Sequence, residues 1–244
     1  QARLVPTNTD QRVRFQVVGA MARFELGEIT TAINDLRQAS LEADGASIKV
    51  QFSTAFVRFV RESDFLAPDD LIPHLTKLRQ LCTQVGDAES LASLHVAVAR
   101  FEGCRGHYLG SHHHLQLARA LASRTTKEPL QLTVDLVEAS LQSQAGNLNR
   151  AQALASASLD RALRNGLAKY ELAALSNLAL IATYRNNLDQ ARQILDQMLE
   201  SSGFLSYARV GTLDSLAQLE LRRDDMKECQ RVISVCADTT AGSP

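Results

Sequence analysis

A run of three histidines is the strongest candidate for metal chemistry in this sequence. His112, His113 and His114 are consecutive, and His107 precedes them. If this stretch is helical, consecutive side chains point about 100° apart, so the three rings cannot converge on one metal ion. His107 could approach Ser111 or His114 across a turn, but no carboxylate or cysteine completes a ligand set. We therefore predict a solvated helix face and no metal site.

Cys104 is the candidate for thiol chemistry, because Arg100 and Arg105 lie close to it in the sequence. Positive charge near a thiol lowers its pKa and favours the reactive thiolate, as a redox switch would require. The alternative is a small side chain that packs between helices, and we favour that interpretation. The sequence contains no HExxH, no GxSxG, no P-loop and no Gly-rich dinucleotide loop. We predict no enzymatic activity and no cofactor.

Small residues recur at fixed distances from a short break, and this pattern organises the whole chain. In the stretch 138–158 the break is Gly146, with Ala139 seven residues before it and Ala151, Ala155 and Ser158 five, nine and twelve after it. Small residues at these offsets let two antiparallel helices approach closely, and glycine supplies the backbone conformation that a tight turn needs. The stretch therefore predicts a helix–turn–helix pair.

The same offsets recur around four other breaks. These breaks are Gly27, Gly106, Asn186 and Asp224. The residues at the four offsets are Ala20, Ala32, Leu36 and Ala39; Ala99, Ser111, Leu115 and Ala118; Ala179, Ala191, Leu195 and Met198; and Ala217, Cys229, Ile233 and Cys236. The breaks from residue 106 onward lie 40, 40 and 38 residues apart, and the 79 residues before them leave room for one divergent copy with its break near Glu62.

The order small, Gly, Ala, large apolar, Ala at these spacings resembles the tetratricopeptide repeat. The usual period of that family is about 34 residues, whereas HEAT and armadillo repeats run about 40–47. The bulky and aromatic positions of the family are mostly missing, and the chain has no Trp. The recurring offsets still favour the tetratricopeptide family, and the longer period resembles the sensor superhelix of MalT-type bacterial transcriptional regulators.

The resemblance implies an all-α fold, a right-handed α-α superhelix or solenoid of about six helix–turn–helix repeats. We expect one solenoid over residues 1–244, in which each pair covers the apolar face of its neighbour. The expected repeats span about 9–45, 46–86, 87–125, 128–166, 167–202 and 204–238. Gly19, Gly103 and Gly211 lie inside helices at a cost of roughly 1 kcal/mol each, so we expect neighbouring helices to pack closely against them.

The composition is that of a globular protein without a strongly charged partner. Of the 244 residues 45% are hydrophobic and 22% are charged, and the formal net charge is −1. This balance does not require the basic face of a nucleic-acid binder, and no apolar run reaches the roughly 18 residues of a membrane span. The start, QARLVPTNTDQ, has no apolar signal-peptide core. We expect a cytoplasmic protein that contacts neither nucleic acid nor membrane.

Two further features concern the cellular setting. The four cysteines are scattered along helical segments, and we expect them to be reduced, as in a cytosolic protein; they are Cys82, Cys104, Cys229 and Cys236. The sequence begins without Met and ends in TTAGSP, so we expect a piece of a longer protein.

In tetratricopeptide arrays the first helix of each pair lines a concave groove, so the resemblance implies a binding surface there. Carried over to this chain, the groove has two zones. The N-terminal zone is apolar and contains Met21, Phe24, Phe52, Phe56 and Phe59. The other zone is polar and contains Arg100, Ser140, Ser143, Gln144, Thr183, Tyr184, Asp214, Gln218 and Arg222.

Both zones have a simpler explanation. Phe52, Phe56 and Phe59 lie on one helical face, and they could either pack in the core, where phenylalanine is usually found, or form an apolar groove for a partner helix. The polar zone suits a hydrogen-bonded ligand or a polar peptide, and a solvated surface is the alternative. The lysine and asparagine clamp that some family members use for acidic C-terminal tails is not recognisable.

We expect a non-catalytic binding domain, the regulatory or sensor segment of a larger bacterial transcriptional regulator in which partner binding is coupled to signal transduction. The alternative is a stand-alone scaffold that holds protein partners in its concave groove. The expected partner is a protein or peptide, or a small-molecule effector. Val232, Ile233 and Val235 on the last helix are apolar, so another element or a second copy of the chain is expected to cover that end.

Overall fold

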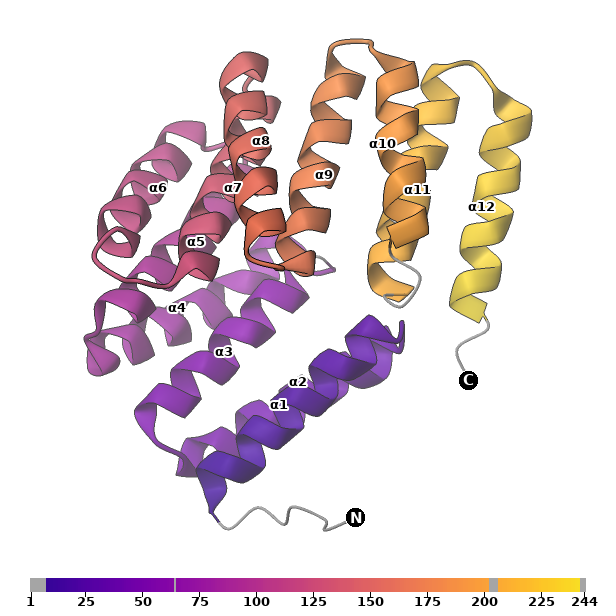
Figure 1. The fold of residues 1–244 in the computed structure, drawn as a ribbon. Helices are drawn as coiled ribbons and strands as arrows, with labels where there is room; N and C mark the ends of the chain where they lie inside the picture. The colour runs from indigo at the N-terminus through magenta and orange to yellow at the C-terminus, as the bar shows by residue number, and fades with distance from the viewer. Residues whose placement is uncertain (1–7, 64, 202–205, 242–244) are drawn as a thin grey trace. The chain divides into compact units, whose positions relative to one another are not determined.

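The residues that a computed structural model describes, 8–63, 65–201 and 206–241, are almost entirely helical (Figure 1). They form twelve α-helices and one short 3-10 helix, and no strand occurs in these ranges. The helices are α1 (Thr9–Glu25), α2 (Ile29–Glu42), α3 (Ile48–Glu62), α4 (Pro68–Val85), α5 (Ala88–Cys104), α6 (Tyr108–Ala122), α7 (Glu128–Gln144), α8 (Leu148–Arg164), α9 (Ala168–Tyr184), α10 (Leu188–Ser201), α11 (Ser206–Arg222) and α12 (Met226–Ala241), with η1 (Ala43–Gly45) after α2. The predicted all-α repeat class is confirmed.

The helices pack in consecutive pairs within two compact units. Residues 28–130 and most of α1 belong to the first unit, and residues 131–244 make up nearly all of the second. Within the described part of each unit, helices contact only helices that are one or two elements away in the chain. The described helices fall within the six expected repeat ranges, except that α12 runs on to Ala241.

The boundary between α4 and α5 shows how the sequence sets helix ends. Pro68 occupies the first turn of α4, where its missing N–H costs nothing. Gly86 ends α4 with a left-handed backbone, φ +69°. Asp87 then caps α5, because its Oδ1 accepts a 2.7 Å hydrogen bond from the backbone N–H of Ser90.

The five breaks that carry the repeated offsets adopt the left-handed backbone conformation, whereas the break expected near Glu62 does not, because Ser63 follows α3 with a right-handed backbone, φ −64°. Gly27, Gly106 and Gly146 have φ of +85°, +76° and +81°, and Asn186 and Asp224 both have φ of +60°. Side chains with a Cβ resist this conformation, although Asn and Asp tolerate it better than most. The fixed offsets in the sequence therefore mark turns of one common geometry.

The small residues at the repeated offsets are buried between the paired helices. In the four repeats with breaks at Gly27, Gly106, Gly146 and Asn186, each of these side chains is at most 5% exposed. The last repeat differs: Ala217 and Cys229 are buried, Cys236 is half-buried and Ile233 is 55% exposed. The outer face of α12 has no further helix to cover it among the described residues, which explains the exposure.

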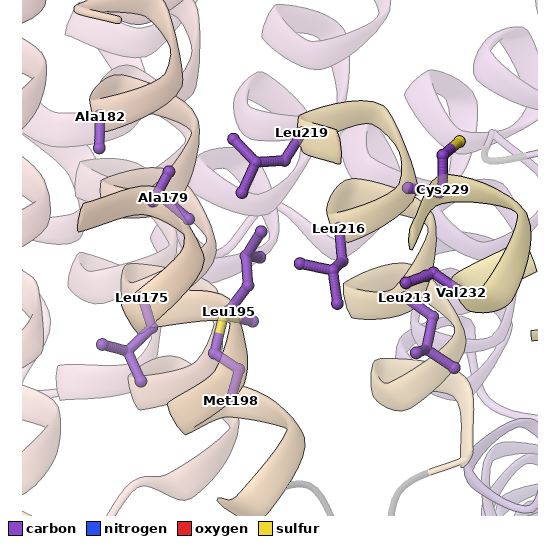
Figure 2. Close-up of a cluster of buried hydrophobic side chains, with 12 residues drawn as sticks. Leu175, Ala179, Ala182, Leu195, Met198, Leu213, Leu216, Leu219, Cys229 and Val232 are labelled. Atoms are coloured by element: carbon purple, nitrogen blue, oxygen red, sulfur yellow. The ribbon is translucent and has the colours of Figure 1, made fainter. Parts of the chain in front are cut away.

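Four helices share the core at the C-terminal end of the second unit. Figure 2 shows side chains of α9, α10, α11 and α12 converging on one cluster. Leu195 and Met198 of α10 pack with leucines of α11, while Cys229 and Val232 bring in α12. The last two repeats therefore share one apolar cluster, as the expected stacking requires.

Two interior glycines do not have the close neighbours that the sequence led us to expect. A Cβ built on Gly19 or on Gly211 would meet nothing within 4 Å. The expectation of tight helix packing at these two positions was therefore wrong, and their intrinsic cost to the helix is not offset there by packing. Gly103 is buried in α5.

This contrast predicts opposite stability effects for the same substitution. Gly146→Ala should lower the free energy of unfolding by about 1–2 kcal/mol, because a left-handed backbone is costly once a Cβ is present. Gly211→Ala should raise it by about 0.5–1 kcal/mol, because alanine is the better residue in an open helical position. Urea unfolding followed by circular dichroism measures both changes. If the two substitutions changed the free energy of unfolding in the same direction, the result would contradict the turn geometry.

Candidate binding surfaces

The aromatic residues of the expected N-terminal zone belong mainly to the core. Phe24, Phe52 and Phe59 are 0%, 5% and 2% exposed, and Met21 and Phe56 are half-buried. The ring of Phe24 lies under the Arg61 guanidinium, 5.2 Å from its carbon to the ring centroid. The expectation that Phe24, Phe52 and Phe59 line a binding groove is therefore wrong, because a partner could not reach these buried rings.

The reason lies in the packing of α3 between α4 and α5. The rings of Phe52 and Phe56 stack with centroids 6.2 Å apart. Phe52 and Phe59 share one buried cluster with residues of the next two helices, and Phe56 packs against it. The buried members from α4 and α5 are Leu71, Leu75, Leu78, Leu81, Cys82, Leu94, Ala97, Val98 and Phe101. The stripe therefore holds the first unit together.

The expected polar residues of the second unit are mostly exposed. We call this set the polar first-helix face: Ser140 and Gln144 on α7, Thr183 and Tyr184 on α9, and Asp214, Gln218 and Arg222 on α11. Gln144, Tyr184 and Arg222 each stand two residues before the break of their repeat, and all three are exposed. Ser140 and Thr183 are half-buried, and Ser143 is buried with its hydroxyl donating to the Ala139 carbonyl.

Contacts between the three first helices bring parts of this face together. The Arg222 guanidinium lies over the Tyr184 ring at 5.9 Å, which joins α11 to α9. Asn177 of α9 donates a 3.2 Å hydrogen bond to the Leu136 carbonyl of α7. Gln218 donates to Asp214 along α11 at 2.9 Å. The Thr183 hydroxyl donates its proton to the Ala179 carbonyl and so cannot donate it to a partner at the same time.

The candidates for thiol and metal chemistry lie near the turn between α5 and α6. Cys104 is exposed at the end of α5 and Arg100 is half-buried on the same helix in the first unit. The Arg105 guanidinium lies over the Phe101 ring at 5.4 Å. His107 Nδ1 lies 2.9 Å from Glu102 Oε2 on the surface. Among the described residues, no three His, Cys, Asp or Glu side chains are placed to hold a metal ion.

Buried carboxylates paired with arginine are a feature of both units that the sequence analysis missed. Glu62, Glu138 and Glu220 are each at most 3% exposed, and each binds an arginine from another helix. The signal was available, because each falls on the buried side of its helix: Glu62 follows buried Phe59 by three residues, and Glu220 follows Ala217 by three. A carboxylate on an apolar face requires a partner when it is buried.

Glu62 has the richest surroundings of the three. It accepts 3.0 Å hydrogen bonds from Arg37 Nε and Arg58 Nε, and His74 Nδ1 lies 2.8 Å from its Oε2. Burial alone would raise the pKa of Glu62, but the contacts with His74, Arg37 and Arg58 outweigh it and lower the pKa from 4.5 to about 2. Glu62 is therefore charged at neutral pH and ties α2, α3 and α4 together.

Two half-buried histidines meet across α5 and α6. His95 Nδ1 and His114 Nδ1 are 2.9 Å apart, and the rings stack with centroids 5.1 Å apart. Burial lowers the pKa of both rings, and the neighbouring charges of His113 and Arg79 lower it further. Glu102 acts in the opposite direction on His114. One Nδ1 must donate and the other accept, so the pair cannot keep this bond when both rings are charged.

This pair predicts a loss of stability at mildly acidic pH. The folded-state pKa lies below 6.5, so the unfolded chain binds protons first and stability falls as pH drops through about 6.5. The melting temperature of His95→Leu should change less than that of the wild type between pH 7.5 and 5.5. His112→Gln, at an exposed position of α6, is the matched control and should keep the wild-type slope; an unchanged slope in His95→Leu would contradict the prediction.

The sequence matches no known protein-family model, and it is not significantly similar to any curated protein. No helix in the described ranges combines the length and apolarity needed to cross a membrane. Function is therefore inferred from the surfaces of this chain.

Proposed function

We propose that this chain is a non-catalytic helical-repeat binding domain, and that the polar first-helix face of the second unit holds a protein or peptide segment. The observation that carries this proposal is the exposure of Gln144, Tyr184 and Arg222 at the same place in three successive repeats. Side chains that recur at one repeat position form a row along neighbouring helices, and such a row suits an extended chain.

The chemistry of the face favours a polar partner. Arg222 and Gln218 can donate hydrogen bonds, while Asp214 can accept them, and none of the three is buried. Tyr184 is 42% exposed and supplies an aromatic surface beside the Arg222 guanidinium. Tyrosine and arginine are enriched among the residues that dominate binding energy at protein interfaces. A peptide with alternating polar and apolar side chains would use both properties.

The experiment that tests this proposal starts with a selection from a random peptide library on the whole protein. A selected peptide should bind the wild type, and Gln218→Ala combined with Arg222→Ala should weaken it at least tenfold in a titration. The matched control combines Asp160→Ala and Gln193→Ala, which change exposed residues on the second helices α8 and α10. Both variants should melt within a few degrees of the wild type, because all four side chains are exposed.

Selection of no peptide, or equal binding by both double variants, would remove the proposal. Loss of binding in the control but not in the Gln218 and Arg222 variant would move the site to the second helices. Since the aromatic stripe of α3 is buried, a peptide that depended on it would imply unfolding of the first unit.

For the wider setting, we propose a regulatory segment of a cytoplasmic bacterial transcriptional regulator resembling the MalT type. The repeat spacing of about 40 residues supports this setting. Binding on the polar first-helix face would then shift the conformation or self-association of attached domains. The exposed Ile233 and Met226 on α12 support self-association at that end. The alternative is a stand-alone scaffold, and the reading frame of the gene distinguishes the two by the presence of a DNA-binding module.

A further inference from the structure

A hollow of about 210 Å³ opens between α2, α3 and α4 in the first unit. Each of these helices contributes to its wall, and η1 closes one side. Its lining includes Asp44, Ala55, Arg58, Pro73, His74 and Lys77. Its volume is below the roughly 300–1,000 Å³ of sites for drug-sized ligands, so only a small molecule fits.

The polar part of this wall carries two basic side chains, Arg58 and Lys77, together with His74 and the carboxylate of Asp44. Arg58 uses only Nε for its bond to Glu62, which leaves the paired Nη groups without a partner among the described residues. Lys77 Nζ donates one of its three protons in a 3.1 Å hydrogen bond to Asp44 Oδ1. His74 contacts Glu62 through Nδ1 and keeps Nε2 for another partner. The wall therefore offers a guanidinium fork and an ammonium group.

Glu62 fixes the orientation of two of these groups. It is 1% exposed, accepts a hydrogen bond from Arg58 Nε and contacts His74 Nδ1 at 2.8 Å. A buried carboxylate that holds the side chains of a site lowers the cost of ordering them when a ligand arrives. Arg58 and His74 are therefore held in place before a ligand arrives.

We propose that this hollow binds a small monocarboxylate with a short apolar portion. The Arg58 fork matches the two oxygens of a planar carboxylate, and Lys77 adds a second charge. The apolar portion would contact Ala43, Ala55 and Pro73. Asp44 at the exposed rim disfavours anions of higher charge, such as phosphate. The inference does not rest on the proposed peptide surface, which lies in the second unit.

The test is a titration of the ¹⁵N-labelled full chain with sodium isobutyrate and sodium benzoate, followed by amide chemical shifts at constant ionic strength. Saturable shifts with millimolar Kd, confined to amides of residues 40–58 and 73–77, are expected for ligands of this size. The neutral amides, isobutyramide and benzamide, should bind at least tenfold more weakly. Lys77→Gln should weaken carboxylate binding at least fivefold. The variant should keep the amide spectrum of a folded protein, because the Lys77 side chain is half exposed.

Lys127→Gln is the matched control, because this lysine is similarly exposed, also pairs with a carboxylate, and lies outside the hollow. It should bind the carboxylates as the wild type does. Equal binding of the amides and the carboxylates, shifts spread over the surface, or no saturation would overturn the proposal. Tighter binding of inorganic phosphate would overturn the assignment to a carboxylate.

Discussion

Phe59→Ala is expected to lower the free energy of unfolding by about 3–5 kcal/mol, because it empties the space of a buried aromatic ring. Phe59 is 2% exposed and shares its cluster with leucines of α4 and with Phe101 of α5. The cavity would lie where three helices meet, so the surrounding side chains cannot collapse into it without moving a helix. Guanidinium unfolding followed by circular dichroism gives the value directly.

Phe15→Ala is the matched control, since this ring is 49% exposed on α1. It should change the free energy of unfolding by no more than about 0.5 kcal/mol. A loss below about 1 kcal/mol for Phe59→Ala, with selected peptides no longer bound, would instead mean that the aromatic stripe is a surface for partners.

Glu62→Gln is expected to cost about 2–3 kcal/mol at pH 7. The neutral amide leaves Arg37, Arg58 and His74 without the charge that they surround. Breaking a fully buried pair costs about 3–5 kcal/mol, but Arg37 is half exposed and regains water. Thermal and urea unfolding of the two proteins at pH 7 measures the difference.

The same variant predicts a change in acid stability. The folded-state pKa of Glu62 is lowered to about 2 from 4.5, so the stabilisation is present above pH 4.5 and is lost as pH falls towards 2. The wild type should therefore lose more stability than Glu62→Gln over that interval. Arg231 and Arg192 also lower the pKa of Glu228 to about 2, but this pair lies at the surface.

Glu228→Gln is accordingly the control, and added salt separates the two sites. In about 1 M NaCl the screening length is about 3 Å, which weakens surface pairs more than buried ones. The acid-dependent loss assigned to Glu62 should survive this salt, whereas the contribution of Glu228 should shrink. Equal salt sensitivity would show that Glu62 is open to solvent.

Turn chemistry and residue size allowed the repeat pattern to be predicted without a structure. Gly146, Asn186 and Asp224 mark left-handed turns because few residue types accept that conformation. Small residues such as Ala151 and Ala191 mark the places where two helices touch. Both signals are local, so a single sequence carries them. They failed at Ile233, which is 55% exposed, and at the divergent break near Glu62, where Ser63 keeps a right-handed backbone.

The candidate sites were harder to predict, because they depend on pairings between helices. A stripe such as Phe52 and Phe59 has the same spacing whether a neighbouring helix or a partner covers it, so periodicity could not separate core from groove. The Arg37–Glu62 and Arg192–Glu220 pairs join residues 25 and 28 positions apart. No local pattern selects one arginine among the many on neighbouring helices, and the hollow beside Glu62 was missed for the same reason.

The restriction of helix contacts to near neighbours in each unit governs how the chain assembles. Because the described helices contact only near neighbours in the chain, the entropy cost of loop closure is small and the contact order is low. Low contact order is typical of domains that fold in microseconds to milliseconds. A ribosome adds roughly 5–20 residues per second, so a pair of helices emerges over seconds. Within each unit, a pair can then dock on the preceding one before the next is made, and the order of synthesis becomes the order of assembly.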